Sequence, residues 1–125
     1  MQILSETNVE LHPVIQKTLD LFVEKVKENQ GDNLLKIILF GSVARREANE
    51  DSDIDVLVIL KNRNSNQMLD ISSISVYVEK YMKYDENACL QPLVISEEES
   101  IGLNFYNLMN NVNREGLILH DSTWQ

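Results

Sequence analysis

The chain has 125 residues, of which 43% are hydrophobic and 25% are charged, and its formal net charge is −9 at pH 7. These values are typical of a soluble globular domain and exclude a disordered chain. Affinity for nucleic acid in general depends on Lys and Arg, so the acidic charge argues against an extended nucleic-acid surface. A single cysteine, Cys89, excludes an internal disulfide and a cysteine-based zinc site, and it fits a reducing cytoplasm.

The N-terminal part of the chain is expected to form a helix and then a strand. Pro13 opens a segment that ends before Gly31 and has apolar residues at helical spacing: Ile15, Leu19, Phe22 and Val26. The run 34–40 is short, apolar and partly β-branched, and Gly41 follows it directly, which predicts a strand. No apolar run in the chain approaches the roughly 20 residues that cross a bilayer, so we expect no membrane partner.

The middle of the chain predicts further elements in this order: a short helix at 43–48, a polar turn at 49–52, a strand at 53–60, a loop at 61–67, a helix at 68–84 and a strand at 89–95. On the 68–84 helix a stripe of tyrosines is expected to pack in the core or to meet a partner: Tyr77, Tyr81 and Tyr84.

The C-terminal part predicts a last helix and a short apolar piece. Ser96 and Glu99 have the spacing of a capping box, which predicts a helix from Ser96 towards Asn111. Gly116 ends this region before the apolar residues 117–119. The alternation of helices and strands predicts an α/β fold over residues 1–125, a single domain in which helices cover a small mixed sheet.

Asp53 and Asp55 are the first candidates for chemistry. They are two residues apart on a predicted strand, so their carboxylates point to the same face, with Cα atoms about 6.5–7 Å apart. Two charges about 5 Å apart repel by roughly 3 kcal/mol at an effective dielectric constant of about 20, so a cation is expected between them. Mg²⁺ is the natural ligand because it takes oxygen ligands from one or two carboxylates and from substrate phosphates.

Gly41 and Ser42 are the second candidates. They follow a predicted strand and precede a predicted helix, where backbone amides and a hydroxyl can contact phosphate oxygens, and glycine permits close approach of the backbone. The ten residues between Ser42 and Asp53 are enough to return the chain to the neighbouring strand. A triphosphate could therefore lie between the Gly-Ser turn and the two aspartates.

These motifs carry a resemblance to a known family. The segment from Gly41 to Arg45, followed by the segment from Ser52 to Asp55, resembles the signature of the minimal nucleotidyltransferases of the polymerase-beta-like superfamily. Segments 95–99 and 111–116 also resemble later parts of such domains. The resemblance implies that Asp53 and Asp55 are catalytic and hold Mg²⁺ or Mn²⁺, and that Gly41, Ser42 and Arg45 bind the triphosphate of ATP or another NTP.

The chain departs from the family pattern at two places. Family members usually carry Gly where this chain has Arg46, and many active members have a third carboxylate on the strand that corresponds to 89–95. That strand has none here, and Gln91 is its only long polar side chain. The acidic run 97–99 could replace the missing carboxylate, although helix capping explains these residues without catalysis.

Three functions fit the sequence. The resemblance implies a Mg-dependent nucleotidyltransferase that moves a nucleoside monophosphate, AMP from ATP, to a hydroxyl. The acceptor implied by similarity to antitoxins encoded beside HEPN-domain toxins is a tyrosine of such a toxin. The second hypothesis is a non-catalytic antitoxin that silences its partner by binding, with a relic nucleotide site. The third is a small-molecule nucleotidyltransferase similar to aminoglycoside-modifying enzymes.

Overall fold

The computed structural model describes residues 2–3, 11, 13–45, 53–82 and 90–122. Its elements, in chain order, are β1 Gln2–Ile3, α1 Pro13–Gln30, the 3₁₀ helix η2 Gly31–Asn33, β2 Leu34–Phe40, α2 Gly41–Ala44, β3 Ile54–Leu60, α3 Ser65–Met82, β4 Leu90–Ser96, α4 Glu97–Ser100, the 3₁₀ helix η3 Leu103–Phe105, α5 Tyr106–Glu115 and β5 Leu117–Asp121. Within these described ranges, no helix is both long and apolar enough to span a membrane.

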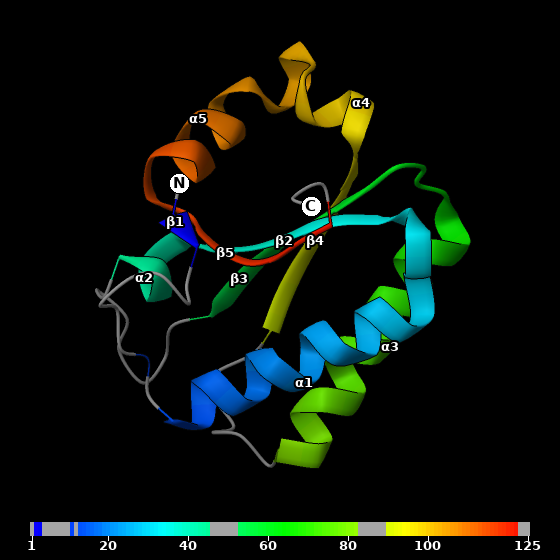
Figure 1. Cartoon of the computed structure of the whole chain (residues 1–125), viewed down its shortest axis with the longest axis vertical. Coiled ribbons are helices and arrows are strands. Elements are labelled where there is room, and N and C mark those ends of the chain that lie inside the picture. The colour runs from blue at the N-terminus through cyan, green and yellow to red at the C-terminus, as the bar shows by residue number, and fades with distance from the viewer. Residues whose placement is uncertain (1, 4–10, 12, 46–52, 83–89, 123–125) are drawn as a thin grey trace.

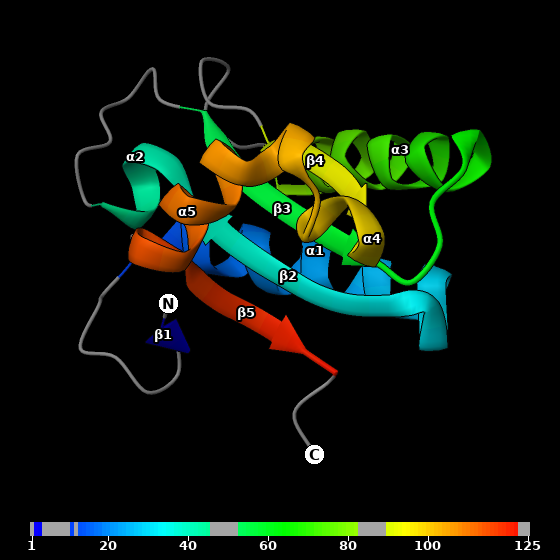
Figure 2. The ribbon, with the colours of Figure 1, turned by 90° about the horizontal axis from the view of Figure 1, so that it is seen from above.

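The strands form one mixed sheet in the order β1-β5-β2-β3-β4. β2 is antiparallel to both β3 and β5, whereas β3 is parallel to β4 and β1 is parallel to β5. Figure 1 shows α4 and α5 above this sheet and α1 and α3 below it, and Figure 2 shows the same sheet from the α5 side. The predicted α/β fold with a mixed sheet covered by helices is confirmed.

Alternation along the strands divides the core into two parts. Toward α1 and α3, β3 buries Ile54, Val56, Val58 and Leu60 against helix residues that include Leu19, Phe22 and Ile71. Toward α5, the intervening β3 residues Leu57 and Ile59 pack with Ile38, Ile95 and Val112. A strand buried on both faces has a nearly continuous apolar sequence, as residues 56–60 do. Asp55 belongs by this alternation to the α5 side of the sheet.

Three sequence expectations need correction. The predicted helix from Ser96 towards Asn111 is split into α4, η3 and α5, because Gly102 has an extended ψ of 169° that a helix cannot continue through. The apolar piece 117–119 is part of strand β5. The predicted loop at 61–67 is shorter, because α3 already begins at Ser65, where Asn64 accepts a hydrogen bond from the Gln67 amide at 3.1 Å.

Other expected elements are confirmed with small shifts of their ends. The first helix ends at Gln30, and the strand expected at 53–60 begins at Ile54. The capping box is present, because the Glu99 amide donates to Ser96 Oγ while Glu99 Oε1 accepts from the Ser96 amide. The helix expected at 43–48 is only partly present: α2 begins at Gly41 and ends at Ala44, and Arg45 is already a turn residue. Residues 46–52 lie outside the described residues, as does Tyr84.

Candidate functional site

Gly41 stands where β2 ends and α2 begins, and its backbone requires glycine. Its φ is +75°, a left-handed conformation that residues with a Cβ rarely adopt. A Cβ built on Gly41 would also collide with Oδ2 of Asp55. The turn is therefore packed directly against the Asp55 carboxylate, and a side chain of any size would displace one or the other.

The pairing of β2 with β3 brings the candidates to one end of the sheet. In the antiparallel β2–β3 pair, Phe40 lies opposite Asp55, so the residue before Gly41 is the cross-strand partner of the second aspartate. Asp53 lies just before β3 and is exposed, whereas Asp55 is half-buried. The expected meeting of the Gly-Ser turn with the Asp-x-Asp strand start is thus present in the geometry.

Burial and two neighbouring charges act on the pKa of Asp55. Burial raises the pKa of this carboxyl above its usual value, and the negative charge of nearby Asp53 raises it further. The positive charge of Arg45 acts in the opposite direction. A carboxylate that is both desolvated and next to a second carboxylate favours either a proton or a cation, and such groups cluster at functional sites.

Arg45 follows α2 and forms an ion pair with a residue near the C-terminal end of the chain. Its guanidinium NH1 donates to Oε1 of Glu115, the last residue of α5, at 3.0 Å. Glu115 thereby neutralises part of the positive charge of Arg45. Sequence reasoning assigned no role to Glu115, because seventy positions separate it from Arg45 and no local pattern links the two.

The strand beside Asp55 carries an amide, Gln91, where the resemblance led us to look for a third carboxylate. Gln91 is the parallel partner of Asp55 in the β3–β4 register and is exposed. Glu99 does not substitute for it, because its carboxylate caps α4 and bonds to Arg63 Nε at 2.7 Å. These contacts lower the pKa of Glu99, the hydrogen bond from the Ser96 backbone being the largest cause. The capping explanation of Glu99 is therefore confirmed.

Several sequence candidates lie outside the described residues: Arg46, Ser52 and Cys89. Among the residues that are described, no three His, Cys, Asp or Glu side chains form a cluster that could hold a metal ion by themselves. Two aspartates, with phosphate oxygens and water, are the donor set that Mg²⁺ ordinarily uses, and it does not need a cage made only of protein groups.

Comparisons with known proteins extend this picture. A candidate protein adenylyltransferase of Methanocaldococcus jannaschii, MJ1305, is 53% identical over 49 residues, which are 39% of this chain and 33% of that protein. The matched segment thus spans about a third of the length of this curated relative.

Two solved structures have a similar fold. Spectinomycin adenyltransferase AAD(9) from Enterococcus faecialis, solved with ATP and spectinomycin, has a TM-score of 0.63 and 12% identity, over 86% of this chain and 56% of that chain. A tri-AMPylated Shewanella oneidensis HEPN toxin in complex with an MNT antitoxin contains a chain with a TM-score of 0.51 and 17% identity, over 86% of this chain and 73% of that one. At these identities the likeness concerns the fold alone.

The family model for the nucleotidyltransferase domain matches residues 19–103, which include Gly41, Ser42, Asp53 and Asp55. This match covers about two thirds of the chain, and it agrees with the mixed sheet and with the placement of Gly41 beside Asp55. The chain belongs to the nucleotidyltransferase domain family.

Proposed function

We propose that this nucleotidyltransferase, acting as a single domain over residues 1–125, transfers AMP from ATP to a hydroxyl group of a protein. The observation that carries the proposal is the direct packing of Gly41 against the Asp55 carboxylate. The turn proposed to bind phosphate thus lies directly beside a carboxylate suited to a metal ion. Such an arrangement suits a substrate that is both a polyphosphate and a metal complex.

The residues divide the work as follows. Gly41 and Ser42 bind the triphosphate through the backbone and the Ser42 hydroxyl, and Arg45 adds positive charge beside them. Asp53 and Asp55 hold Mg²⁺, which fits the raised pKa of Asp55 and its proximity to Asp53. Bound there, Mg²⁺ would neutralise charge on the triphosphate and on the departing pyrophosphate.

The proposed reaction is a substitution at the α-phosphorus of ATP. The acceptor hydroxyl oxygen bonds to the α-phosphorus of ATP, the bond from this phosphorus to the oxygen that bridges to the β-phosphate breaks, and pyrophosphate leaves. The hydroxyl proton passes to a base of the acceptor protein or to solvent, because Gln91, next to Asp55, cannot accept it. Loss of a general base costs about 10²–10⁴-fold in rate, so slow transfer is expected.

The proposed acceptor is a tyrosine of a HEPN-family toxin, which would make this chain a cytoplasmic antitoxin. The support is the resemblance of fold to a chain in the complex of an AMPylated HEPN toxin with its MNT antitoxin. The matching protein adenylyltransferase candidate from Methanocaldococcus jannaschii supports a protein acceptor as well. A side chain on the acceptor protein could supply the base that this chain lacks on β4.

The experiment is co-expression of the chain with the product of the adjacent reading frame, followed by intact mass measurement of that partner. Addition of one or more AMP units is expected with the wild type and not with Asp53→Asn combined with Asp55→Asn. Asp32→Asn is the matched control, because Asp32 is an exposed aspartate in η2, at the opposite end of β2 from Gly41. AMP on the partner with the double variant would refute the proposed site.

A second candidate function is favoured by Gln91. If the amide at the position of the third carboxylate marks a lost activity, the chain silences its partner by binding alone. The same experiment separates the two functions: a partner that is bound and silenced but carries no AMP indicates the non-catalytic antitoxin.

A further inference from the structure

Glu115 is the last residue of α5, and its carboxylate contacts the segment that carries the Gly-Ser turn. Its Oε1 accepts a hydrogen bond from NH1 of Arg45 at 3.0 Å. The backbone amide of Arg45 in turn donates to the carbonyl oxygen of Gly41 at 3.1 Å. The ion pair therefore ends a single hydrogen-bonded turn away from the glycine that is proposed to bind phosphate.

Packing fixes the backbone on both sides of Glu115. Val112, one helical turn earlier, is fully buried, and Leu117, two residues later, is buried in a strand that pairs with β2. A Cβ on the intervening Gly116 would lie 2.6 Å from the Val112 carbonyl oxygen and 2.8 Å from Cγ2 of Ile38 in β2. The chain thus approaches β2 too closely for any residue except glycine. The Glu115 carboxylate therefore extends from a backbone whose position relative to β2 is set by the core.

The Arg45 side chain is long, and it is more exposed than its partner. It is 39% exposed, whereas the Glu115 side chain is 20% exposed. A long side chain loses rotamer freedom when a ligand orders it, and a site that has already ordered the side chain avoids this cost. The bond to Glu115 restricts the guanidinium in this way. Because a guanidinium has five N–H donors, this bond is compatible with a bond from the same group to a phosphate.

The charge of Arg45 also acts at the aspartate end of the site. Burial and the charge of Asp53 raise the pKa of Asp55, whereas the positive charge of Arg45 lowers it. The guanidinium is therefore close to the Asp55 carboxylate as well as bonded to Glu115. A triphosphate held between the Gly-Ser turn and Asp55 would lie beside this guanidinium.

We propose that Glu115 is a positioning residue of the nucleotide site, which orders the Arg45 guanidinium for contact with the triphosphate. This role rests on the proposed function, because it requires ATP bound between the Gly-Ser turn and Asp55. The alternative is that Glu115 acts on the nucleotide only through its negative charge. The two roles have opposite signs. Removal of a carboxylate that only repels phosphates strengthens ATP binding, whereas removal of a positioning carboxylate weakens it.

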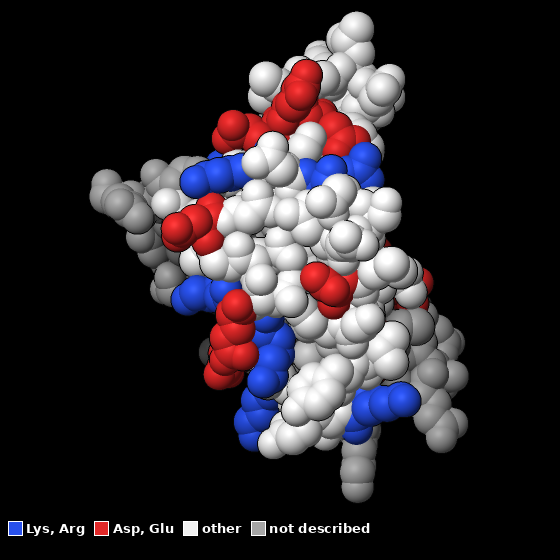
Figure 3. Space-filling model, turned by 90° about the vertical axis from the view of Figure 1, so that its right-hand side faces the viewer, with Lys and Arg blue, Asp and Glu red and all other residues white. Residues whose placement is uncertain are grey.

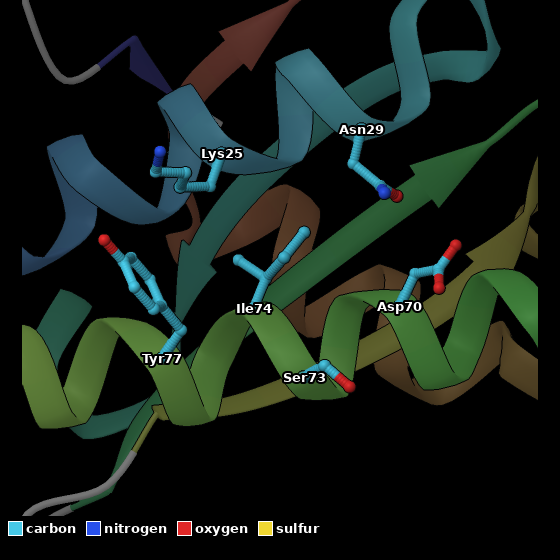
Figure 4. A pocket seen from close by; sticks show the side chains of 6 residues that line it. All are labelled: Lys25, Asn29, Asp70, Ser73, Ile74 and Tyr77. Carbon is cyan, nitrogen blue, oxygen red and sulfur yellow. The ribbon is translucent and has the colours of Figure 1, made fainter.

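A surface ion pair is not by itself evidence for such a role, and the chain offers a matched control. Figure 3 shows Lys and Arg side chains beside Asp and Glu side chains at several places on one face of the molecule. Lys25 and Glu28 form an ion pair on α1 at 3.8 Å, and the Glu28 side chain is 60% exposed. Figure 4 shows Lys25 and Tyr77 pointing into the groove between α1 and α3, which lie on the other side of the sheet from α5. Breaking this pair therefore does not reach the site.

The test is isothermal titration of the full chain with Mg-ATP, with thermal unfolding of each variant without ligand to show that it is folded. Glu115→Ala should weaken Mg-ATP binding by roughly 2–10-fold, the effect of leaving one long side chain unordered. Glu115→Gln should bind at least as tightly as wild type, because the amide oxygen can accept the same hydrogen bond from Arg45. Glu28→Ala also removes one negative charge and one ion pair, and it should leave the affinity unchanged.

A double variant tests whether Glu115 acts through Arg45. Arg45→Ala combined with Glu115→Ala should bind Mg-ATP no more weakly than Arg45→Ala alone. Unchanged or tighter binding by Glu115→Ala would overturn the positioning role, as would losses that add in the double variant. These results would leave the proposed function intact if wild type binds Mg-ATP and Asp53→Asn with Asp55→Asn does not. Failure of wild type to bind Mg-ATP would refute the proposed function, and the positioning role with it.

Discussion

Replacement of Gly41 by alanine tests the link between fold and site, because the chain contains its own control. Gly41 and Gly31 are the two glycines with positive φ among the described residues, at +75° and +54°. A Cβ at Gly31 meets nothing within 4 Å, whereas a Cβ at Gly41 meets the Asp55 carboxylate. Gly31→Ala therefore measures the backbone effect alone, and Gly41→Ala measures the backbone effect together with displacement of Asp55.

The expected magnitudes follow from these two geometries. A left-handed backbone costs a residue with a Cβ about 1–2 kcal/mol, so both variants lose at least this much stability. Moving the Asp55 side chain off its rotamer adds about 0.5–1.5 kcal/mol in Gly41→Ala. For a domain of this length, each kcal/mol lowers Tm by roughly 3–5 °C. Loss of one hydrogen bond to a charged phosphate, about 1.5–3 kcal/mol, weakens ATP binding by roughly 10–150-fold.

Two measurements separate these effects. Thermal unfolding without ATP and metal gives the stability of each variant, and isothermal titration with Mg-ATP gives the affinity of the folded protein. Gly31→Ala should lose stability and keep the affinity of wild type, whereas Gly41→Ala should lose both. A folded Gly41→Ala protein that binds Mg-ATP as tightly as wild type would refute the phosphate-binding role of this turn.

Three further predictions concern the site, and a fourth concerns the cap of α4. Mg-ATP should raise the Tm of wild type, and Asp53→Asn with Asp55→Asn should abolish this shift in a thermal-shift assay, since binding to the folded state alone is stabilising. Because the pKa of Asp55 is raised on folding, its ionisation removes stability as pH rises above the unfolded value of 3.8. Urea unfolding in EDTA should therefore show Asp55→Asn gaining stability over wild type at pH 7 and gaining less at pH 4. Arg45→Ala should weaken ATP binding in titrations, while Glu115→Gln should not; equal losses would mean that Arg45 acts only through their ion pair. Ser96→Ala should lose about 1 kcal/mol in urea unfolding by removing the α4 cap, with no change in Mg-ATP affinity.

The spacing of apolar residues along the chain predicted the helices and strands that are buried in the core. Leu19, Phe22 and Val26 are fully buried, as expected for the apolar side of the first helix. Residues 34–40 and 54–60 form the two central strands because each is apolar enough to be covered on both faces. In such segments the local pattern and the tertiary environment agree, so sequence alone predicts the element.

The C-terminal part was predicted less well, because its structure depends on distant partners. Residues 117–121 are short, and they become strand β5 by pairing with β2, which lies about eighty positions earlier. The sequence around Gly102 was compatible with one continuous helix. The break between α4 and η3 is visible only in the extended backbone conformation of Gly102. Glycine has low helix propensity, yet a single glycine does not by itself locate a break.

The site was predictable in part for a related reason. The meeting of Gly41 with Asp55 follows from two adjacent strand ends, so spacing along the chain was sufficient to expect it. The Arg45–Glu115 ion pair is different, because it joins the end of α2 to the end of α5 and leaves no pattern in either segment. Local sequence motifs therefore predict site residues at the ends of adjacent strands. The structure is needed to find a residue such as Glu115, which comes from a helix packed on the sheet.

Folding constrains Gly41 and Asp55 more tightly than it constrains Gln91. Gly41 and Asp55 are held by the β2–β3 pairing, and a change at either one disturbs packing as well as chemistry. Gln91 lies on the edge strand β4, is exposed, and can change with little effect on the core. Substitution is thus least constrained by folding at the position of the third carboxylate. A substitution of Gln91 should therefore change the rate of the proposed transfer more than the stability of the fold, whereas a substitution of Gly41 or Asp55 should change both.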